Sequence, residues 1–513
     1  MRPQFNLNAV HTWHGIPNAN QLREFGFGTI CVALSFPLWP SLPALFEVFI
    51  ICALLGLCYL QQLRVFYLGL IFGLIFFTYN STAWQNHSAF LKQTPQWQIL
   101  GLIEDIKITS QRTIVQVSVM APKALSEQKF QLIDRDPFKE YQHGQHWLLS
   151  VTIAPVPEHW HATKPYQKSL FGQNISATGW VHNSLLQDHA PSIRGQLLSE
   201  ARRLGVSKDS WLPALLLGIK PVESEFSSAL KNAGIIHLFV ISGLHFAVVA
   251  GGFYWFFKRI DVMTYTRLSH RQSRLLICLA LILAGYFYVD VVGAQGPAQR
   301  AFVAMCIGLL LRWLYVRVRF SDLLLGVFFY LVLTDPFCVV LASIYLTFGA
   351  LLCIGFCAHW LPLNMDTRWQ KIKGFVAFQM VFTVLFTPVQ YHILGYIHPL
   401  SWLWNLLFIP IITLFFVPVG GVLLVIMYVN KLSNGMFEPI VQGGVLILDF
   451  SLEWLLSVLV NHLTEPVYGS ISLLGVLGCW LVIISGASLP IIWWGRCGVV
   501  VVGLGLLILG LTL

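Results

Sequence analysis

The chain has 513 residues, of which 56% are hydrophobic and only 11% are charged. A soluble domain could not bury that much apolar surface, so the composition excludes a soluble globular protein and predicts a polytopic membrane protein. The formal net charge of +9 would suit a nucleic-acid partner. The basic residues are nevertheless distributed as membrane topology requires, which accounts for most of that charge.

The ten cysteines lie in or beside apolar segments, and none lies between residues 85 and 235. This distribution indicates neither a disulfide framework nor a paired Cys-x-x-Cys metal site. We therefore expect the cysteines to be small apolar core residues, and we expect no cofactor.

Residues 1–84 are predicted to form N-terminal transmembrane helices. Residues 27–60 are typical of a helical hairpin, and a third apolar span follows near residues 65–79. Residues 1–25 are polar and contain no long apolar core, so we expect no cleavable signal peptide.

Residues 85–195 are predicted to form a small extracytoplasmic β domain. Four of its segments alternate in polarity or are rich in β-branched residues, which is typical of strands. They are residues 101–108, 113–120, 147–153 and 175–181. Short strands separated by glycine and proline predict a barrel or a sandwich.

Residues 196–235 are predicted to form interfacial amphipathic helices. The segment 209–218 is too short and interrupted to span a bilayer comfortably, and residues 222–232 are typical of a helix outside the bilayer that ends at Gly234.

Residues 236–513 are predicted to form the main transmembrane domain. Several of its apolar segments are shorter than the roughly 20 residues that a perpendicular helix needs, so broken or re-entrant helices are expected. The segments are 236–257, 275–290, 300–315, 322–334, 337–358, 374–393, 401–428, 438–460, 471–489 and 491–513. Pro410 and Pro418 predict a break within residues 401–428.

Basic residues concentrate in alternate loops, whereas the short loops 392–402 and 461–468 contain no lysine or arginine. By the positive-inside rule the basic loops are cytoplasmic, which places the N-terminus inside and the β domain outside. The basic set comprises Arg23, Arg64, residues 258–274, Arg312, Arg317, Arg319, Arg368, Lys371, Lys373, Lys431 and Arg496.

The segment His-Leu-Phe-Val-Ile-Ser-Gly-Leu-His, from His237 to His245, places polar groups inside an apolar span. Such groups are costly at membrane depth unless they face a partner or a water-filled path. Ser242 and His245 are three residues apart and would share one helical face. We therefore predict that His237, Ser242, Gly243 and His245 line a polar path, with an interhelical hydrogen bond as the alternative.

Arg300 and Asn405 are further candidates for lining this path. Pro297 suits the first turn of a helix, which would place Arg300 where the helix dipole disfavours a cation. Asp290, Asp335 or a bound phosphate could compensate the charge, and extension to the external surface is the alternative. The Asn405 amide lies in an apolar span and either bridges helices or lines the path.

Residues 214–218 (Ala-Leu-Leu-Leu-Gly) and 232–245 (Asn-Ala-Gly-Ile-Ile-His-Leu-Phe-Val-Ile-Ser-Gly-Leu-His) resemble the central signature of the ComEC competence family. Gln299, Ser343 and Thr347 depart from the family pattern. Segments 293–301, 334–336, 343–348, 387–388, 405–410 and 418–420 resemble later elements of that pattern, so the resemblance covers roughly residues 27–490.

The resemblance implies a polytopic α-helical membrane protein with an extracytoplasmic OB-like β-barrel, in which residues 236–513 are the competence-type channel domain. It implies a channel in the bacterial inner membrane that moves single-stranded DNA into the cytoplasm during natural transformation. The implied partners are single-stranded DNA, the membrane, a periplasmic DNA receptor and a cytoplasmic DNA-translocating ATPase.

An OB-like surface binds single strands with aromatic platforms and basic residues. Trp147 and Trp180, with Lys164 and Lys168 nearby, are the candidate DNA-binding residues, and packing in the barrel core is the alternative for each aromatic ring. Residues 85–195 contain ten lysines and arginines against eight acids, so the electrostatic signal is weak.

Many members of the family carry a further C-terminal metallo-β-lactamase-like domain, whose His-x-His-x-Asp-His cluster is absent from these 513 residues. The histidines of the β domain lack an acid or cysteine that would complete a ligand set, so no metal site is predicted. They are His143, His146, His159 and His161. We expect a channel without a catalytic site of its own.

Two alternatives belong to other functional classes. One is a membrane-embedded hydrolase with Ser242 as nucleophile and His245 as base, although no neighbouring acid would orient that histidine. The other is a proton-coupled transporter of small solutes, which would leave the large β domain unexplained.

Overall fold

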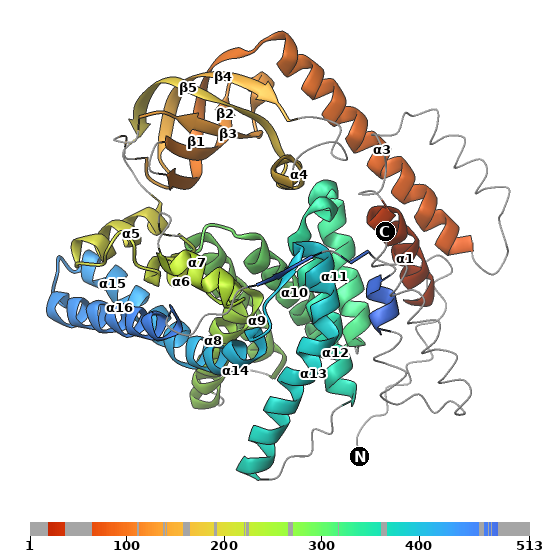
Figure 1. Cartoon of the computed structure of the whole chain (residues 1–513), viewed down its shortest axis with the longest axis vertical. Helices are drawn as coiled ribbons and strands as arrows, with labels where there is room; N and C mark the ends of the chain where they lie inside the picture. The colour runs from red at the N-terminus through yellow and green to blue at the C-terminus, as the bar shows by residue number, and fades with distance from the viewer. Residues whose placement is uncertain are drawn as a thin grey trace. The chain divides into compact units, whose positions relative to one another are not determined.

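The computed structural model describes residues 19–35, 64–109, 112–136, 139, 141–156, 165–188, 192–219, 221, 225–264, 270–316, 318–360, 367–460, 466–469, 471–472 and 475–480. The chain divides into two compact units (Figure 1). Unit 1 comprises residues 1–94, 155–176 and 318–341, and unit 2 comprises the rest. Most of the predicted hairpin at 27–60, most of the segment 471–489 and all of 491–513 lie outside the described residues.

The described part of unit 1 is mainly helical. Its elements are α1 (Ala19–Ser35), α3 (Arg64–Gln93), α4 (Pro165–Gly172), α11 (Phe320–Thr334) and the 3₁₀ turn η6 (Pro336–Val340). The predicted third span corresponds to the first half of α3, which continues beyond residue 79 through polar sequence to Gln93.

Helices α1 and α3 approach each other closely because glycines lie at their contact. A Cβ atom on Gly69 would collide with the carbonyl group of Phe25. The hydroxyl of Thr29 donates a hydrogen bond across the interface to the carbonyl oxygen of Gly69 at 3.0 Å. Small residues and interhelical hydrogen bonds are the usual means of joining helices in a bilayer, where apolar surface alone gives no preference for a neighbouring helix over lipid.

Unit 2 contains a closed five-stranded barrel in the order β1-β2-β3-β5-β4 (Figure 1). The strands are β1 (Gln96–Thr109), β2 (Arg112–Ala121), β3 (Lys129–Asp134), β4 (His146–Pro155) and β5 (Ile175–Asp188), with the short 3₁₀ turn η4 (Lys123–Leu125) after β2. Strand β1 pairs with β2 along one edge and with β4 along the other, which closes the barrel. Burial alternates along β2 and β4, as expected when every second side chain points inward.

The expected OB-like barrel is thereby confirmed, and the four predicted strands correspond to β1, β2, β4 and β5. Strand β3 was not predicted. It is only six residues long and begins and ends with charged residues, Lys129 and Asp134, so its sequence carries little strand signal.

The rest of unit 2 is a helical bundle preceded by short helices. The short elements are α5 (Ile193–Arg203), α6 (Leu212–Leu217), α7 (Glu225–Asn232) and the 3₁₀ turn η5 (Ile236–Leu238). The bundle elements are α8 (Gly243–Thr264), α9 (His270–Val291), α10 (Gly296–Trp313), α12 (Ala342–Trp360), α13 (Arg368–Leu394), α14 (Ser401–Ile411), the π-helical turn η7 (Ile412–Phe416), α15 (Val417–Leu432) and α16 (Glu438–Val460). Two short strands, β6 (Tyr396–Ile397) and β7 (Val467–Tyr468), form a separate sheet.

Five helical stretches within the described residues are long and apolar enough to cross a membrane, which confirms a polytopic membrane protein. They are Ile236–Ile260, Gln272–Val291, Arg368–Leu394, Ser401–Leu432 and Glu438–Leu459.

The predicted break within residues 401–428 is a π-helical turn that leaves the chain helical from Ser401 to Leu432. The wider π turn follows Pro410, whose ring interrupts the regular series of backbone hydrogen bonds in the α-helix. The α-helix begins again after the turn, with Pro418 in its first turn. The hydroxyl of Thr413 donates to the carbonyl oxygen of Ile409 at 2.6 Å, so the turn gains an additional hydrogen bond.

All six residues of helix α6 are buried, so the helix has no exposed polar face, and its location at the membrane interface stays a prediction. The Leu216 side chain packs against Gly420 of α15, where a Cβ atom would collide with it. Ser210 caps the start of α6 by accepting from the Leu212 N–H at 3.0 Å, and its hydroxyl donates to Asp449 of α16. The segment is therefore part of the bundle core.

The turn between α15 and α16 lies against α5. Lys431 donates to the side-chain oxygen of Gln196 at 2.9 Å, and Arg203 pairs with Glu438 at 2.8 Å. Lys431 therefore lies against α5, and the assignment of its loop to the cytoplasmic face stays a prediction. A lone lysine that has a local partner is a weak topological marker, since the rule depends on an excess of charges in a loop.

Candidate functional site

The Ser242-Gly-Leu-His245 motif forms the N-cap of α8. Ser242 lies just before the helix, and its hydroxyl oxygen accepts a hydrogen bond from the backbone N–H of His245 at 3.2 Å. In return, Nδ1 of His245 accepts from the backbone N–H of Ser242 at 3.4 Å. This exchange is a capping box in which histidine replaces the usual glutamate or glutamine. The prediction that both side chains lie on one helical face was wrong, because Ser242 is outside the helix.

The cap fixes the protonation pattern of His245. Because Nδ1 accepts a hydrogen bond, the proton of the neutral ring is on Nε2. The side chain is fully buried, and Nε2 has no hydrogen-bond partner among the described residues. A buried donor without a partner is costly, so this N–H is available to a ligand or a bound water molecule.

Four helices of the bundle begin at the same end. A Cβ atom on Gly243 of α8 would lie 3.6 Å from the Ala301 Cβ atom, so α8 and α10 begin side by side. Arg300, in the first turns of α10, donates to the Thr347 hydroxyl of α12 at 3.0 Å. Gly234, just before η5, lies against His398 and Ser401 at the start of α14.

We call this end, where α8, α10, α12 and α14 begin, the barrel-side end, because the barrel attaches there through the contacts described below. Helix N-termini carry unpaired N–H groups and partial positive charge, so their convergence favours an anion.

Arg300 is buried and does not extend to an exposed surface. Its guanidinium also lies 3.5 Å from the carbonyl oxygen of Ser343, one turn before Thr347. Two segments that resemble separate family elements, residues 293–301 and 343–348, therefore meet at this contact. At position 347, which is a threonine here, the hydroxyl oxygen accepts a hydrogen bond from the Arg300 guanidinium.

The barrel is joined to the bundle by the buried Arg194 of α5. Its Nε donates to the carbonyl oxygen of Leu217 at 2.9 Å, and one terminal nitrogen donates to the carbonyl oxygen of Gly218 at 3.2 Å. The other terminal nitrogen lies 3.2 Å from Nδ1 of His143, in the loop before β4. One side chain thus connects the barrel, α5 and the end of α6.

Gln295, the N-cap residue of α10, completes this junction by donating to the Gly218 carbonyl oxygen at 2.7 Å. Gly293 has a φ of +74°, and a Cβ atom there would collide with the Arg194 guanidinium. Glycine is therefore required on both steric and conformational grounds. Sequence reasoning missed Arg194 and Gln295, and Gly293 was the available sequence signal of a close approach.

His143 is buried beside the Arg194 cation. Burial first and the neighbouring charge second lower the pKa of His143 to about 4 from its ordinary 6.5. The imidazole is therefore neutral near pH 7. Its Nδ1 lies 3.2 Å from the Arg194 nitrogen and 3.1 Å from the Glu104 carbonyl oxygen, so one neutral tautomer accepts from the arginine and the other donates to the carbonyl. The four histidines of the β domain do not all lie in the described part, because His159 and His161 fall outside it. Within the described residues, no three His, Cys, Asp or Glu side chains are placed to hold a metal ion.

The predicted DNA-binding residues of the barrel occupy different environments. Trp147 is only 8% exposed, packs against the ring of Tyr141 and donates to Gln145, so it is a core residue with no free face for a base. Trp180 is 39% exposed, and the Arg135 guanidinium lies 4.6 Å from its ring centroid. Lys164 and the side chain of Lys168 lie outside the described residues.

Asn405 and His237 lie near the barrel-side end. Asn405 is in the second turn of α14, and its side-chain oxygen is buried without a partner among the described residues. His237 is in η5 and is exposed, whereas its neighbours Ile235, Leu238 and Phe239 are buried.

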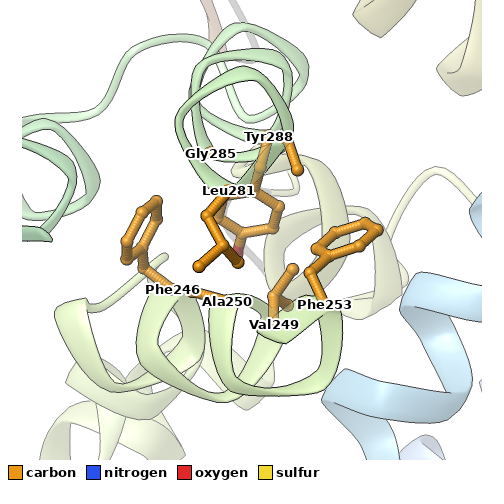
Figure 2. Close-up of a pocket in the computed structure, with 8 residues that line it drawn as sticks. Phe246, Val249, Ala250, Phe253, Leu281, Gly285 and Tyr288 are labelled. Carbon is orange, nitrogen blue, oxygen red and sulfur yellow. The ribbon is translucent and has the colours of Figure 1, made fainter. Parts of the chain in front are cut away.

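An apolar hollow between α8 and α9 has the wrong chemistry for a nucleic acid. Figure 2 shows the aromatic and aliphatic side chains of the two helices that face each other across it. They are Phe246, Val249, Ala250 and Phe253 of α8 and Leu281, Gly285 and Tyr288 of α9. No charged side chain lines this hollow.

The fold and site define a polytopic membrane protein with a small OB-like barrel joined to the end of its bundle where helix N-termini converge. A family model described as competence protein matches residues 215–502, more than half of the chain. The chain therefore belongs to the competence protein family, as the resemblance to ComEC implied.

Three curated relatives show how far this similarity extends. Recombination protein 2 of Haemophilus influenzae is 25% identical over 310 residues, covering 56% of this chain and 38% of that protein. An uncharacterized protein, YcaI, of Escherichia coli is 26% identical over 290 residues, or 54% and 37% of the two chains. ComE operon protein 3 of Bacillus subtilis is 25% identical over 205 residues, or 37% and 25%. The chain thus matches less than two fifths of each relative, and no solved structure matches it.

Replacing Arg194 with Met should loosen the barrel from the bundle. The methionine fills similar space but leaves the Leu217 carbonyl oxygen without its side-chain donor, at a cost of about 1–3 kcal/mol for a buried group, and leaves the Gly218 carbonyl oxygen with Gln295 as its remaining side-chain donor. Limited proteolysis of the purified protein should then cut faster near residues 192–195, at the start of α5. The control Arg203→Met removes an exposed arginine of the same helix and should not change the cleavage rate. Equal cleavage rates in the wild type and in Arg194→Met would contradict the claim that Arg194 holds the barrel to the bundle.

The same joint should weaken at acidic pH. His143 has a lower pKa in the folded protein than in the unfolded chain, so its stabilising contribution is present above pH 6.5 and is lost as pH falls toward about 4. Hydrogen exchange of residues 141–145 and 192–195 should therefore accelerate between pH 6.5 and 4.5 after correction for intrinsic rates. His143→Asn should remove this dependence, while His182→Asn, which changes another histidine of the barrel, should retain it. A corrected exchange rate that does not change with pH in the wild type would refute the claim that neutral His143 stabilises this joint.

Proposed function

We propose that the chain is a channel that moves single-stranded DNA across the bacterial inner membrane during natural transformation. The observation that carries the proposal is the convergence of four helix N-termini at the end of the bundle that bears the barrel. Membership of the competence family supports the same assignment.

The physical argument begins with the phosphates of the strand. Each helix N-terminus stabilises a nearby anion by about 0.3–1 kcal/mol at exposed sites, and by more where water is excluded. Four of them, together with the buried donor at His245 Nε2, make the barrel-side end favourable for a phosphodiester backbone without any base-specific contact. Sequence-independent transport needs an attraction of this kind.

The barrel supplies the complementary contact. The exposed ring of Trp180 and the Arg135 guanidinium over it combine stacking with positive charge. Single-strand-binding surfaces use this pair of properties, because every base has a face on which it can stack. Arg194 then fixes the distance between this surface and the bundle.

The cap geometry argues against the hydrolase alternative. The Ser242 oxygen receives the backbone N–H of His245, and Nδ1 of His245 receives the backbone N–H of Ser242. In a nucleophile–base pair the imidazole nitrogen instead accepts the proton of the serine hydroxyl. Here the Ser242 oxygen and Nδ1 of His245 each accept from the other residue's backbone N–H, so neither is arranged for proton transfer between the two side chains.

We also propose the remaining parts of the uptake system by the same family reasoning. The N-terminus is cytoplasmic, a periplasmic receptor delivers DNA, and a cytoplasmic ATPase draws in the strand.

Substitutions at His245 should separate capping from transport. In His245→Asn the side-chain oxygen replaces Nδ1 as acceptor for Ser242 N–H, but the donor at the Nε2 position is lost. In His245→Gln an amide N–H can reach that position. We expect transformation frequency to fall roughly tenfold or more in the Asn variant, because a hydrogen bond to a charged group contributes about 1.5–3 kcal/mol, and to recover partly in the Gln variant.

Membrane abundance of both variants is measured by immunoblot, with Ser242→Thr as the control that keeps the capping hydroxyl. Wild-type transformation by His245→Asn at normal abundance would contradict a transport role for Nε2. Loss of both variants from the membrane would assign His245 to folding alone and would equally contradict the proposal.

A further inference from the structure

The small sheet formed by β6 and β7 presents exposed aromatic rings. Tyr396 and Tyr468 are paired across the two strands, and their ring centroids lie 6.1 Å apart at an interplanar angle of 65°. Tyr468 is 74% exposed, so its ring has a free face. The ring of His398 lies 5.1 Å from that of Tyr396 on the side toward α14.

The sheet is held rigidly to the bundle. The backbone N–H of Gly469 donates to the carbonyl oxygen of Gly395 at 2.9 Å, and Nδ1 of His392 lies 2.7 Å from the carbonyl oxygen of Ile471. The Tyr391 hydroxyl group occupies the space where a side chain on Gly469 would extend. An aromatic ring on a fixed support loses little conformational freedom when it binds a flat ligand.

The position of the sheet relates it to the proposed site. Helix α13 ends at Leu394, immediately before β6, and α12 and α13 run in opposite directions with Gly349 packed near Val389. The end of α13 therefore lies beside the start of α12, where Arg300 contacts Ser343. The sheet is thus at the barrel-side end, and His398 connects it to Gly234.

The chemistry of this surface favours one ligand class. It combines aromatic faces with an environment that favours anions, and it offers no ordered set of donors and acceptors for reading base identity. Unpaired nucleotides have both a flat base and a phosphate, and stacking on aromatic rings is how proteins hold them without sequence preference. Duplex DNA has no free base faces within the helix.

We propose that the β6–β7 sheet is a base-stacking platform for single-stranded nucleic acid at the barrel-side end, with Tyr468 as the principal contact and Tyr396 as its support. This rests on the proposed transport of single-stranded DNA and names a contact for the strand outside the barrel.

The test uses the full-length protein in detergent and single-stranded oligothymidylate that contains 5-iodouracil, which cross-links to stacked aromatic residues on irradiation. Mass spectrometry should identify cross-links to Tyr468 or Tyr396. Tyr468→Ala should abolish the Tyr468 cross-link and weaken oligonucleotide binding by roughly tenfold, whereas Tyr468→Trp should preserve binding. The matched control is Tyr286→Ala, which removes a tyrosine of similar exposure, 64%, from the membrane helix α9.

Three outcomes would overturn the platform. Cross-links confined to the barrel, for example at Trp180, would remove the platform and leave the proposed function standing. If the Tyr468→Ala protein is depleted from the membrane, but the protein that remains binds the oligonucleotide as tightly as wild type does, the tyrosines are membrane-interface anchors. Absence of any cross-link and of any oligonucleotide binding would refute the proposed function together with the platform.

Discussion

The buried guanidinium of Arg194 is the contact on which the arrangement of unit 2 depends. It donates to two carbonyl oxygens at the end of α6 and reaches the barrel through His143. A buried cation is costly unless its hydrogen bonds are made, so the surrounding backbone must hold one geometry for the charge to remain there. The Gly293 position and the Gln295 amide maintain that geometry, which ties the barrel to the start of α10. This connection gives the barrel a defined position on the bundle.

The beginnings of α8, α10, α12 and α14 give this position its chemical character. A bilayer offers no water to their unpaired N–H groups, so each start must be capped or must face a polar space. The Ser242–His245 exchange caps α8 and leaves a single buried N–H on the imidazole. Arg300 of α10 donates a hydrogen bond to the Thr347 hydroxyl of α12. Helix starts carry positive partial charge, so this end of the bundle favours an anion.

The sequence allowed the membrane class, four of five barrel strands and most spans to be predicted, because hydrophobic length and strand alternation are local signals. The motif around Ser242 and His245 was located correctly, but its geometry was not. Helical spacing alone could not show that Ser242 precedes the helix. Arg194, Gln295 and the Tyr396–Tyr468 pair were missed, since each acquires its role from partners distant in sequence.

The central claim is that the strand meets the bundle at its barrel-side end, and site-specific photo-cross-linking during uptake tests it most directly. A photoreactive amino acid is placed at His237, exposed at that end, or at Trp369, which is 64% exposed at the opposite end of α13. With labelled DNA, position 237 should cross-link both to bound and to translocating strands, and position 369 only during active transport. Cross-links at 369 without any at 237, or none at either position while transformation proceeds, would contradict the account.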